Sequence, residues 1–333
     1  MKLWQLFAAP VVFGLAPLAA PHVAAAQGVI KIDGSSTVFP IAEAVAEEFQ
    51  ISKRGKVRVT VGIAGTGGGF KRFCRGETDI SNASRPILAE EMEACRKAGI
   101  RYIELPVAFD ALTVVVNPQN TWAKTLTPAD LRKMWEPAAQ GRITKWNQVR
   151  ADFPAEPLMM FGPGADSGTF DYFTEAENGK SKASRTDFQA SEDDNVIVQG
   201  VGSNKGAIGY FGYAYYIGNK ERVRAVPIQN HEGKAVAPSV ATVIDGSYEP
   251  LSRPLFIYVR DTAAQRPEVR EFIQFYLGEG AELAREVGYV PLPQQAYQLA
   301  LKHFHDNKLG TVFGGVPEVG VTIDALLARE GKL

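Results

Sequence analysis

Three short stretches rich in glycine, serine and threonine have the composition of anion-binding loops: residues 34–37, 65–69 and 162–169. Each follows an apolar run and precedes a segment with helical spacing. A helix that begins after such a loop leaves backbone N–H groups free at its positive end, where an anion can accept hydrogen bonds from them. A serine or threonine at this position also serves as an ordinary N-cap in many helices. The repetition of the pattern in one chain favours an anion site.

The first stretch lies between an expected strand and an expected helix. Residues 28–32 are typical of a buried strand, and the apolar residues between Ile41 and Phe49 recur at helical spacing. Pro40 suits a first helical turn, where the N–H that it lacks would have no partner. Gly34-Ser35-Ser36-Thr37 therefore forms the turn, with its hydroxyls at the start of the helix.

The second stretch, residues 65–69, follows a strand predicted at 57–63 from alternating apolar and polar residues. A short helix is expected from Phe70. The stretch matches neither the Walker loop nor the dinucleotide fingerprint, because Phe70 and Lys71 stand where those motifs require other residues. A mobile linker is the alternative, but glycines between a strand and a helix are more typical of a loop that another backbone approaches closely.

The third stretch lies between a strand predicted at 158–161 and a helix predicted at 171–177. Arg85 is a further candidate, because Pro86 disfavours helix at the preceding residue and places the arginine at an extended loop tip. Arg85 could instead pair with a surface carboxylate.

Strands alternate with helices along the rest of the chain, which predicts an α/β protein with parallel sheets. The pattern predicts two strands, at 102–107 and 112–116, separated by Ala108-Phe109-Asp110. It also predicts two successive helices, at 267–278 and 279–287. An aromatic cluster around Tyr210 indicates core or inter-domain packing.

Composition narrows the classes of partner. The chain has 333 residues, enough for two domains of roughly 100–200 residues each. Its formal net charge is −1, so no nucleic acid or anionic membrane surface is expected as a partner. Affinity for an anion must then come from local N–H and O–H donors and one or two arginines.

The N-terminus has the pattern of a secretion signal. Lys2 precedes an apolar, uncharged run over 6–20, and Ala24-Ala25-Ala26 is a small-residue cleavage site. We expect removal of residues 1–26 and a soluble, exported protein. In such a compartment Cys74 and Cys95 are expected to form a disulfide, although two buried thiols are the alternative. The four histidines and two cysteines match no metal motif, so neither a metal nor a cofactor is expected.

Taken together, the motifs resemble those of the secreted substrate-binding proteins of phosphate ABC transporters, the PstS family with its SphX branch. The resemblance covers essentially the whole exported chain and rests on the order and spacing of segments 33–40, 65–70, 79–86, 113–118, 135–146, 167–170, 206–210 and 250–259. It implies a two-lobed, hinged periplasmic-binding fold of type II, with two mixed sheets flanked by helices and joined by two hinge strands. Residues 27–109 and 252–333 would form the first lobe and residues 110–251 the second.

The resemblance also implies a function. Such a protein captures inorganic phosphate in the periplasm, as a monomer and not as an enzyme, and delivers it to the permease subunits of an ABC transporter. Carried over by position, the implied donors to phosphate are Ser36, Thr37 and Val38 from the first loop, Thr66 and Gly67 from the second, and Ser167, Gly168 and Thr169 from the other lobe.

Two positions depart from the best-known family pattern. Arg85 stands where the family has an aspartate that accepts the proton of phosphate, and Pro163 stands where it has an arginine. We therefore expect the cationic contact at Arg85 and the proton acceptor at Asp166. Asp166 could instead cap a helix.

Two other functions remain open from the sequence. Another oxyanion, such as sulfate or molybdate, fits the near-neutral charge equally well. An exported phosphoester hydrolase is the alternative of another class, but Ser36, Ser167 and Ser203 lack the Gly-x-Ser-x-Gly elbow and histidines are scarce. A role in adhesion or signalling has no repeat or low-complexity segment to support it.

Overall fold

The computed structural model describes residues 28–316 and 318–332. The predicted signal peptide therefore lies outside the described residues. Within them, no helix is both long enough and apolar enough to cross a membrane.

A nine-stranded mixed sheet runs through the molecule in the order β2-β1-β3-β11-β4-β7-β5-β6, with β8 paired to β4. The strands are β1 Gly28–Gly34, β2 Val57–Val61, β3 Ile80–Ala83, β4 Tyr102–Val116, β5 Met159–Pro163, β6 Gln189–Ser191, β7 Ala207–Gly212, β8 Arg224–Ala225 and β11 Ser252–Arg260. A separate hairpin pairs β9 Ile228–Gln229 with β10 Ala235–Val236. The predicted α/β class is confirmed.

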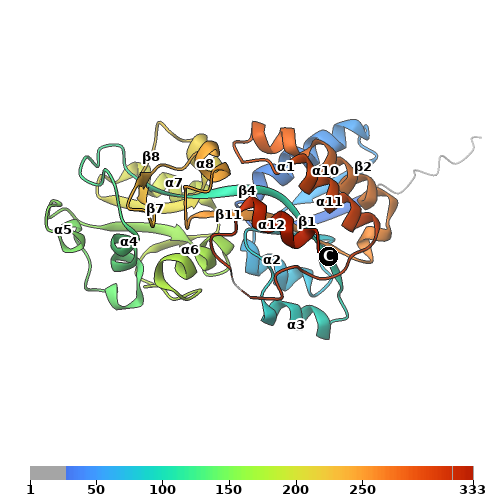
Figure 1. Cartoon of the computed structure of the whole chain (residues 1–333), viewed down its shortest axis with the longest axis horizontal. Coiled ribbons are helices and arrows are strands. Elements are labelled where there is room, and N and C mark those ends of the chain that lie inside the picture. Colours follow the sequence, from blue (N-terminus) through green and yellow to red (C-terminus); the bar gives the residue numbers. More distant parts are fainter. Residues whose placement is uncertain (1–27, 317, 333) are drawn as a thin grey trace, which may run out of the picture.

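Two lobes are built on the two ends of this sheet (Figure 1). The first lobe contains β2, β1, β3 and β11, and the second contains β7, β5 and β6. Strand β4 belongs to both, because it pairs with β11 from Tyr102 to Ala111 and with β7 from Leu112 to Val116. The two predicted sheets are therefore continuous through one shared strand. The prediction of two strands separated at 108–110 is wrong, because all three residues stay extended and pair with β11.

Helices cover the sheet in both lobes (Figure 1). Those of the first lobe are α1 Phe39–Ser52, α2 Gly65–Phe73, α3 Ala89–Lys97, α10 Pro267–Glu286, α11 Gln294–His305 and α12 Ile323–Glu330. Those of the second are α4 Pro128–Trp135, α5 Trp146–Val149, α6 Gly168–Asn178, α7 Asp194–Ser203, α8 Tyr213–Ile217 and α9 Val240–Ile244. Helix α10 is continuous where two helices were predicted, because Gly278 lies in the helix interior and does not end it.

The three glycine-rich stretches each lie where a strand passes into a helix. Helix α2 begins at Gly65, earlier than predicted, so the glycines form its first turns rather than a loop. They allow close packing: a Cβ on Gly69 would lie 2.6 Å from the Cα of Gly34 on β1. Glycine therefore brings the start of α2 directly against the first loop.

The predicted disulfide between Cys74 and Cys95 is present and joins α2 to α3. Both residues are buried in the core of the first lobe. The aromatic cluster has the packing role expected of it, since Tyr210 is fully buried and stacks on Phe173, with ring centroids 3.9 Å apart.

Candidate anion-binding site

Hydroxyl groups from the two lobes meet in the interior between them. The Oγ1 atoms of Thr37 and Thr169 are 3.0 Å apart, and Ser36 Oγ donates to Asp194 Oδ1 at 3.3 Å. All four residues are buried. The first and third predicted stretches, one from each lobe, therefore face one another although Thr37 and Thr169 are 132 residues apart in sequence.

Of the predicted serines and threonines at the starts of α1 and α6, only one is an ordinary helix cap. Ser167 is the N-cap of α6, and its Oγ accepts a hydrogen bond from Thr169 N at 3.1 Å. Helix α1 has Val38 at its N-cap and no side-chain capping bond, so Ser36 and Thr37 do not cap it. Their hydroxyls instead point across to the second lobe.

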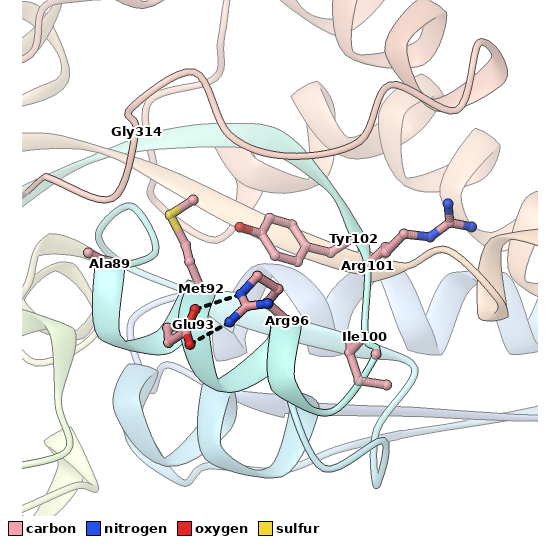
Figure 2. Close-up of a pocket in the computed structure, with 9 residues that line it drawn as sticks. Ala89, Met92, Glu93, Arg96, Ile100, Arg101, Tyr102 and Gly314 are labelled. Carbon is pink, nitrogen blue, oxygen red and sulfur yellow. Dashed lines mark hydrogen bonds and ion pairs between the residues drawn. The ribbon is translucent and has the colours of Figure 1, made fainter.

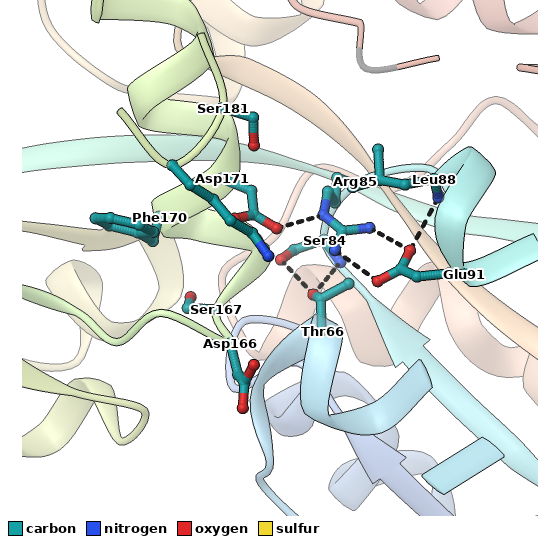
Figure 3. Close-up of polar contacts among 12 residues, drawn as sticks. Thr66, Ser84, Arg85, Leu88, Glu91, Asp166, Ser167, Phe170, Asp171 and Ser181 are labelled. Carbon is teal, nitrogen blue, oxygen red and sulfur yellow. Dashed lines mark hydrogen bonds and ion pairs between the residues drawn. The ribbon is translucent and has the colours of Figure 1, made fainter. Parts of the chain in front are cut away.

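The start of α2 contacts the start of α6 (Figure 3). Gly67 N donates to the backbone oxygen of Asp166 at 2.8 Å, and Thr66 Oγ1 lies 3.1 Å from Ser84 Oγ. Gly168 fits tightly here, because a Cβ on it would lie 2.4 Å from Thr66 Oγ1 and 2.6 Å from Ser84 Oγ. Only a residue without a side chain fits between the two lobes at this point.

Arg85 is buried in a network of carboxylates (Figure 3). Its two Nη atoms each donate to Glu91 at 2.8 Å, Nη1 also donates to Pro86 O, and Nε donates to Asp171 on α6 at 2.7 Å. Arg85 therefore joins the lobes. These four hydrogen bonds use four of the five N–H groups of Arg85 and leave one on Nη2. This Nη2 lies near Gly67, 3.8 Å from where a Cβ on that glycine would lie.

Asp166 lies at the rim of the site rather than inside it. Its side chain is 42% exposed and forms an ion pair with Lys71 at 2.6 Å. Water therefore solvates the Asp166 carboxylate, and Lys71 balances its charge.

Asp194 is the carboxylate that lies inside the site, and it was not among the residues predicted from the sequence. It is fully buried, and its Oδ2 has no hydrogen-bond partner among the described residues. Burial raises the pKa of Asp194 to about 7, although the positive charge of Arg253 acts in the opposite direction. Two aspartates begin α7, and Asp193 is the one that caps it. Asp194 is not needed as a cap, and this second aspartate was the signal in the sequence for a further role.

A second arginine, also missed, lies where the lobes join. Arg253 on β11 is fully buried, and its Nη2 contacts Asp110 Oδ2 at 3.0 Å, Thr37 Oγ1 at 3.3 Å and Thr169 Oγ1 at 2.8 Å. Burial raises the pKa of Asp110, while the charge of Arg253 lowers it. The signal in the sequence is a charged residue inside each of two largely apolar strands, Asp110 in β4 and Arg253 in β11.

Comparisons with known proteins identify the family of this chain. A family model described as the PBP superfamily domain matches residues 19–279. The chain is 56% identical over 311 residues to Protein SphX of Synechococcus elongatus, covering 93% of this chain and 91% of that protein. It is 39% identical to the phosphate-binding protein PstS of Staphylococcus haemolyticus, covering 83% of this chain and 85% of that protein.

The chain belongs to the SphX and PstS family of the PBP superfamily. Among solved structures, a possible phosphate-binding protein from Planctomyces limnophilus is 48% identical, with a TM-score of 0.62 over 85% of this chain and 99% of that one. A putative phosphate transporter substrate-binding protein from Clostridium perfringens, solved with bound phosphate, is 26% identical, with a TM-score of 0.67 over 80% of this chain and 100% of that one. The predicted family and the two-lobed fold are confirmed.

In this member of the SphX and PstS family, a hollow of about 630 Å³ lies on α3, away from the meeting point of the lobes. Figure 2 shows Met92, Tyr102 and Ile100 around it, with the Glu93–Arg96 ion pair at one side. None of the predicted ligand residues lines this hollow. It lies outside the candidate site.

Proposed function

We propose that this protein captures inorganic phosphate between its two lobes, as a periplasmic monomer, and delivers it to the permease subunits of an ABC transporter. The observation that carries the proposal is the buried meeting of Ser36 and Thr37 with Asp194 and Thr169. Hydroxyls and helix N-termini supply the many donors that the oxygens of phosphate require. The relatives named as phosphate-binding proteins support the same ligand. They also favour a binding protein over an enzyme.

Gly67 N donates to Asp166 O in this structure, so it would exchange that bond for one to phosphate. With that exchange, the proposed ligand set keeps every residue predicted from the sequence as a donor. They are Ser36, Thr37, Val38, Thr66, Gly67, Ser167, Gly168 and Thr169, together with the remaining N–H of Arg85. Each buried arginine is already balanced by a carboxylate, Arg85 by Glu91 and Asp171 and Arg253 by Asp110. Hydrogen bonds, rather than an uncompensated positive charge, would therefore hold the anion.

The lobe boundaries are part of the proposal. We assign residues 27–109 and 252–333 to the first lobe and 110–251 to the second. Strand β4 changes partner between Ala111, paired with Ser252, and Leu112, paired with Gly212. This supports a hinge at that point, about which the lobes would open and close around phosphate.

Asp194 replaces Asp166 in our proposal as the acceptor of the proton that phosphate carries. A buried carboxylate oxygen without a donor can accept a hydrogen bond from protonated phosphate, whereas sulfate has no proton to give and would be repelled. Asp166 is half exposed and paired with Lys71, so it lacks this free, buried oxygen.

The test of the function is calorimetry on the exported form after unfolding and refolding to remove bound ligand. Titration with phosphate is expected to give one-to-one binding, and titration with sulfate none. Equal binding of both anions would favour a general oxyanion receptor. Absence of binding to either would overturn the proposal and return the hydrolase to consideration.

Asp194→Asn is expected to lose selectivity. The amide is close to the carboxylate in size but has no charge, so sulfate binding should become measurable while phosphate binding weakens. Competition between the two anions, measured by calorimetry, checks this. Asp166→Asn is the matched control and should leave selectivity unchanged. If Asp166→Asn admits sulfate and Asp194→Asn does not, the acceptor is Asp166.

Arg85→Gln is expected to weaken phosphate binding by about 10- to 100-fold, because a hydrogen bond from a charged donor contributes about 1.5–3 kcal/mol. The same change breaks the contact with Asp171 between the lobes. Asp171→Asn breaks that ion pair while leaving Arg85 and Glu91 in place, and it should weaken binding less. Equal affinities of Arg85→Gln and the wild type would exclude the contact.

A further inference from the structure

Arg253 contacts one threonine from each lobe. Its Nη2 lies 3.3 Å from Thr37 Oγ1 and 2.8 Å from Thr169 Oγ1. Its Nη1 donates to the backbone oxygen of Gly168 at 3.3 Å. Thr37 precedes α1 in the first lobe, and Thr169 and Gly168 begin α6 in the second. The guanidinium thus lies at a point where both lobes meet.

The direction of the threonine hydrogens follows from the chemistry of the guanidinium. Every nitrogen of arginine is a donor and none accepts, so neither hydroxyl hydrogen can point toward Nη2. The contact of 3.0 Å between the two hydroxyls uses one of these hydrogens. The other points away from Arg253 and is left to donate to a ligand.

Asp110 holds the guanidinium in this orientation. It is the register partner of Arg253 across β4 and β11, and its Oδ2 accepts from Nε at 3.3 Å and from Nη2 at 3.0 Å. Its Oδ1 accepts from Tyr213 N at 3.0 Å. Both side chains of the pair are fully buried, so water does not compete for these bonds.

We propose that Arg253, oriented by Asp110, is a positioning residue for the bound anion, because it leaves one hydroxyl hydrogen of the Thr37 and Thr169 pair to donate to that anion. The inference rests on the proposed binding of phosphate. Since one threonine comes from each lobe, this arrangement exists only when the lobes are together. Arg253 therefore links ligand binding to lobe closure from its place on β11, next to β4.

A double-mutant cycle on phosphate affinity tests the inference. Thr169→Val removes one hydroxyl and is expected to weaken phosphate binding about tenfold. Arg253→Lys keeps the charge but loses the fork of donors, and it should weaken binding at least as much. If Arg253 acts through the hydroxyls, the double variant should bind no worse than Arg253→Lys. Thr169→Ser retains a hydroxyl and should bind phosphate more tightly than Thr169→Val.

A purely structural role gives a different result. In that case Arg253→Lys would lower the melting temperature while the folded variant kept wild-type affinity, or the two effects would multiply in the double variant. Arg185→Lys is the matched control, because Arg185 is also buried and paired but bonds to Asp187, Met134 and Ile143. It should lose stability and keep its affinity for phosphate.

Two further outcomes are decisive. If Arg253→Lys does not fold, Asp110→Asn combined with Thr169→Val gives the same cycle, and multiplying effects there would overturn the inference. If the wild type does not bind phosphate, the proposed function fails and the inference fails with it. Binding by the wild type with independent effects of the two substitutions overturns the inference alone.

Discussion

Gly168→Ala is expected to weaken phosphate binding by roughly 5- to 150-fold, the equivalent of the 1–3 kcal/mol that overpacking typically costs. The new methyl group would lie 2.4 Å from Thr66 Oγ1 and 2.8 Å from Thr66 Cβ. Thr66 is fully buried and bonded to Ser84, so it has little room to move aside. The methyl group opposes only the arrangement in which the lobes touch, so it shifts the population toward separated lobes.

Calorimetry measures this effect, and thermal unfolding without phosphate shows whether the fold is intact. Gly278→Ala is the matched control: it lies inside α10, and a Cβ there would meet nothing within 4 Å. It should add up to about 1 kcal/mol of stability and leave the affinity unchanged. Wild-type affinity in Gly168→Ala would mean that the bound form does not place Gly168 against Thr66.

The stability of the wild type is expected to fall as the pH rises from about 5 to 8, and Glu177→Gln should remove one part of this fall. Glu177 on α6 is 5% exposed, and neither of its carboxylate oxygens has a hydrogen-bond partner among the described residues. Burial raises the pKa of Glu177 to about 8 from its usual value of 4.5. Between these values the folded protein binds a proton that the unfolded chain releases, so folding becomes less favourable with rising pH.

At 1.36 kcal/mol per pKa unit, the effect at pH 8 is on the order of 4 kcal/mol in favour of Glu177→Gln, and it is absent near pH 4.5. Urea unfolding at several pH values measures it as the difference between variant and wild type. Burial also raises the pKa of Glu104 to about 7 and of Glu330 to about 8. Because the variant and the wild type share these groups, the difference between the two proteins reports on Glu177. Glu47→Gln, on the exposed side of α1, should follow the wild type. Parallel curves for Glu177→Gln and the wild type would contradict the prediction.

Local patterns in the sequence predicted where strands pass into helices, although residues 65–69 form the first turns of α2 and not a loop. A strand, a glycine-rich turn and an amphipathic helix follow one another without interruption between residues 28 and 52, so their order alone places Ser36 and Thr37 at a helix start. The resemblance to a family then placed the first loop opposite the third, around Thr169. The errors in the elements were local too: Asp110 inside β4 and Gly278 inside α10 were each interpreted as a break.

The charged centre of the site could not be predicted in the same way. Arg253 and Asp110 are isolated charges in apolar segments, and their meaning depends on β11 lying beside β4. Asp194 gains its role only from the contact with Ser36, 158 residues earlier in the chain. Arg85 and Asp166 were chosen because they adjoin recognisable motifs. Adjacency in sequence does not reveal which carboxylate is buried and which is exposed.

The position of β11 sets an order on folding as the chain is synthesised from its N-terminus. In the first lobe β11 lies between β3 and β4, yet it is the last strand to be made. Until residue 260 has been made, β3 and β4 each have an unpaired edge, whereas β4, β7 and β5 of the second lobe are already available to pair. The second lobe can thus assemble first, and the first lobe is completed last. In the interval the exposed edges of β3 and β4 need protection from aggregation.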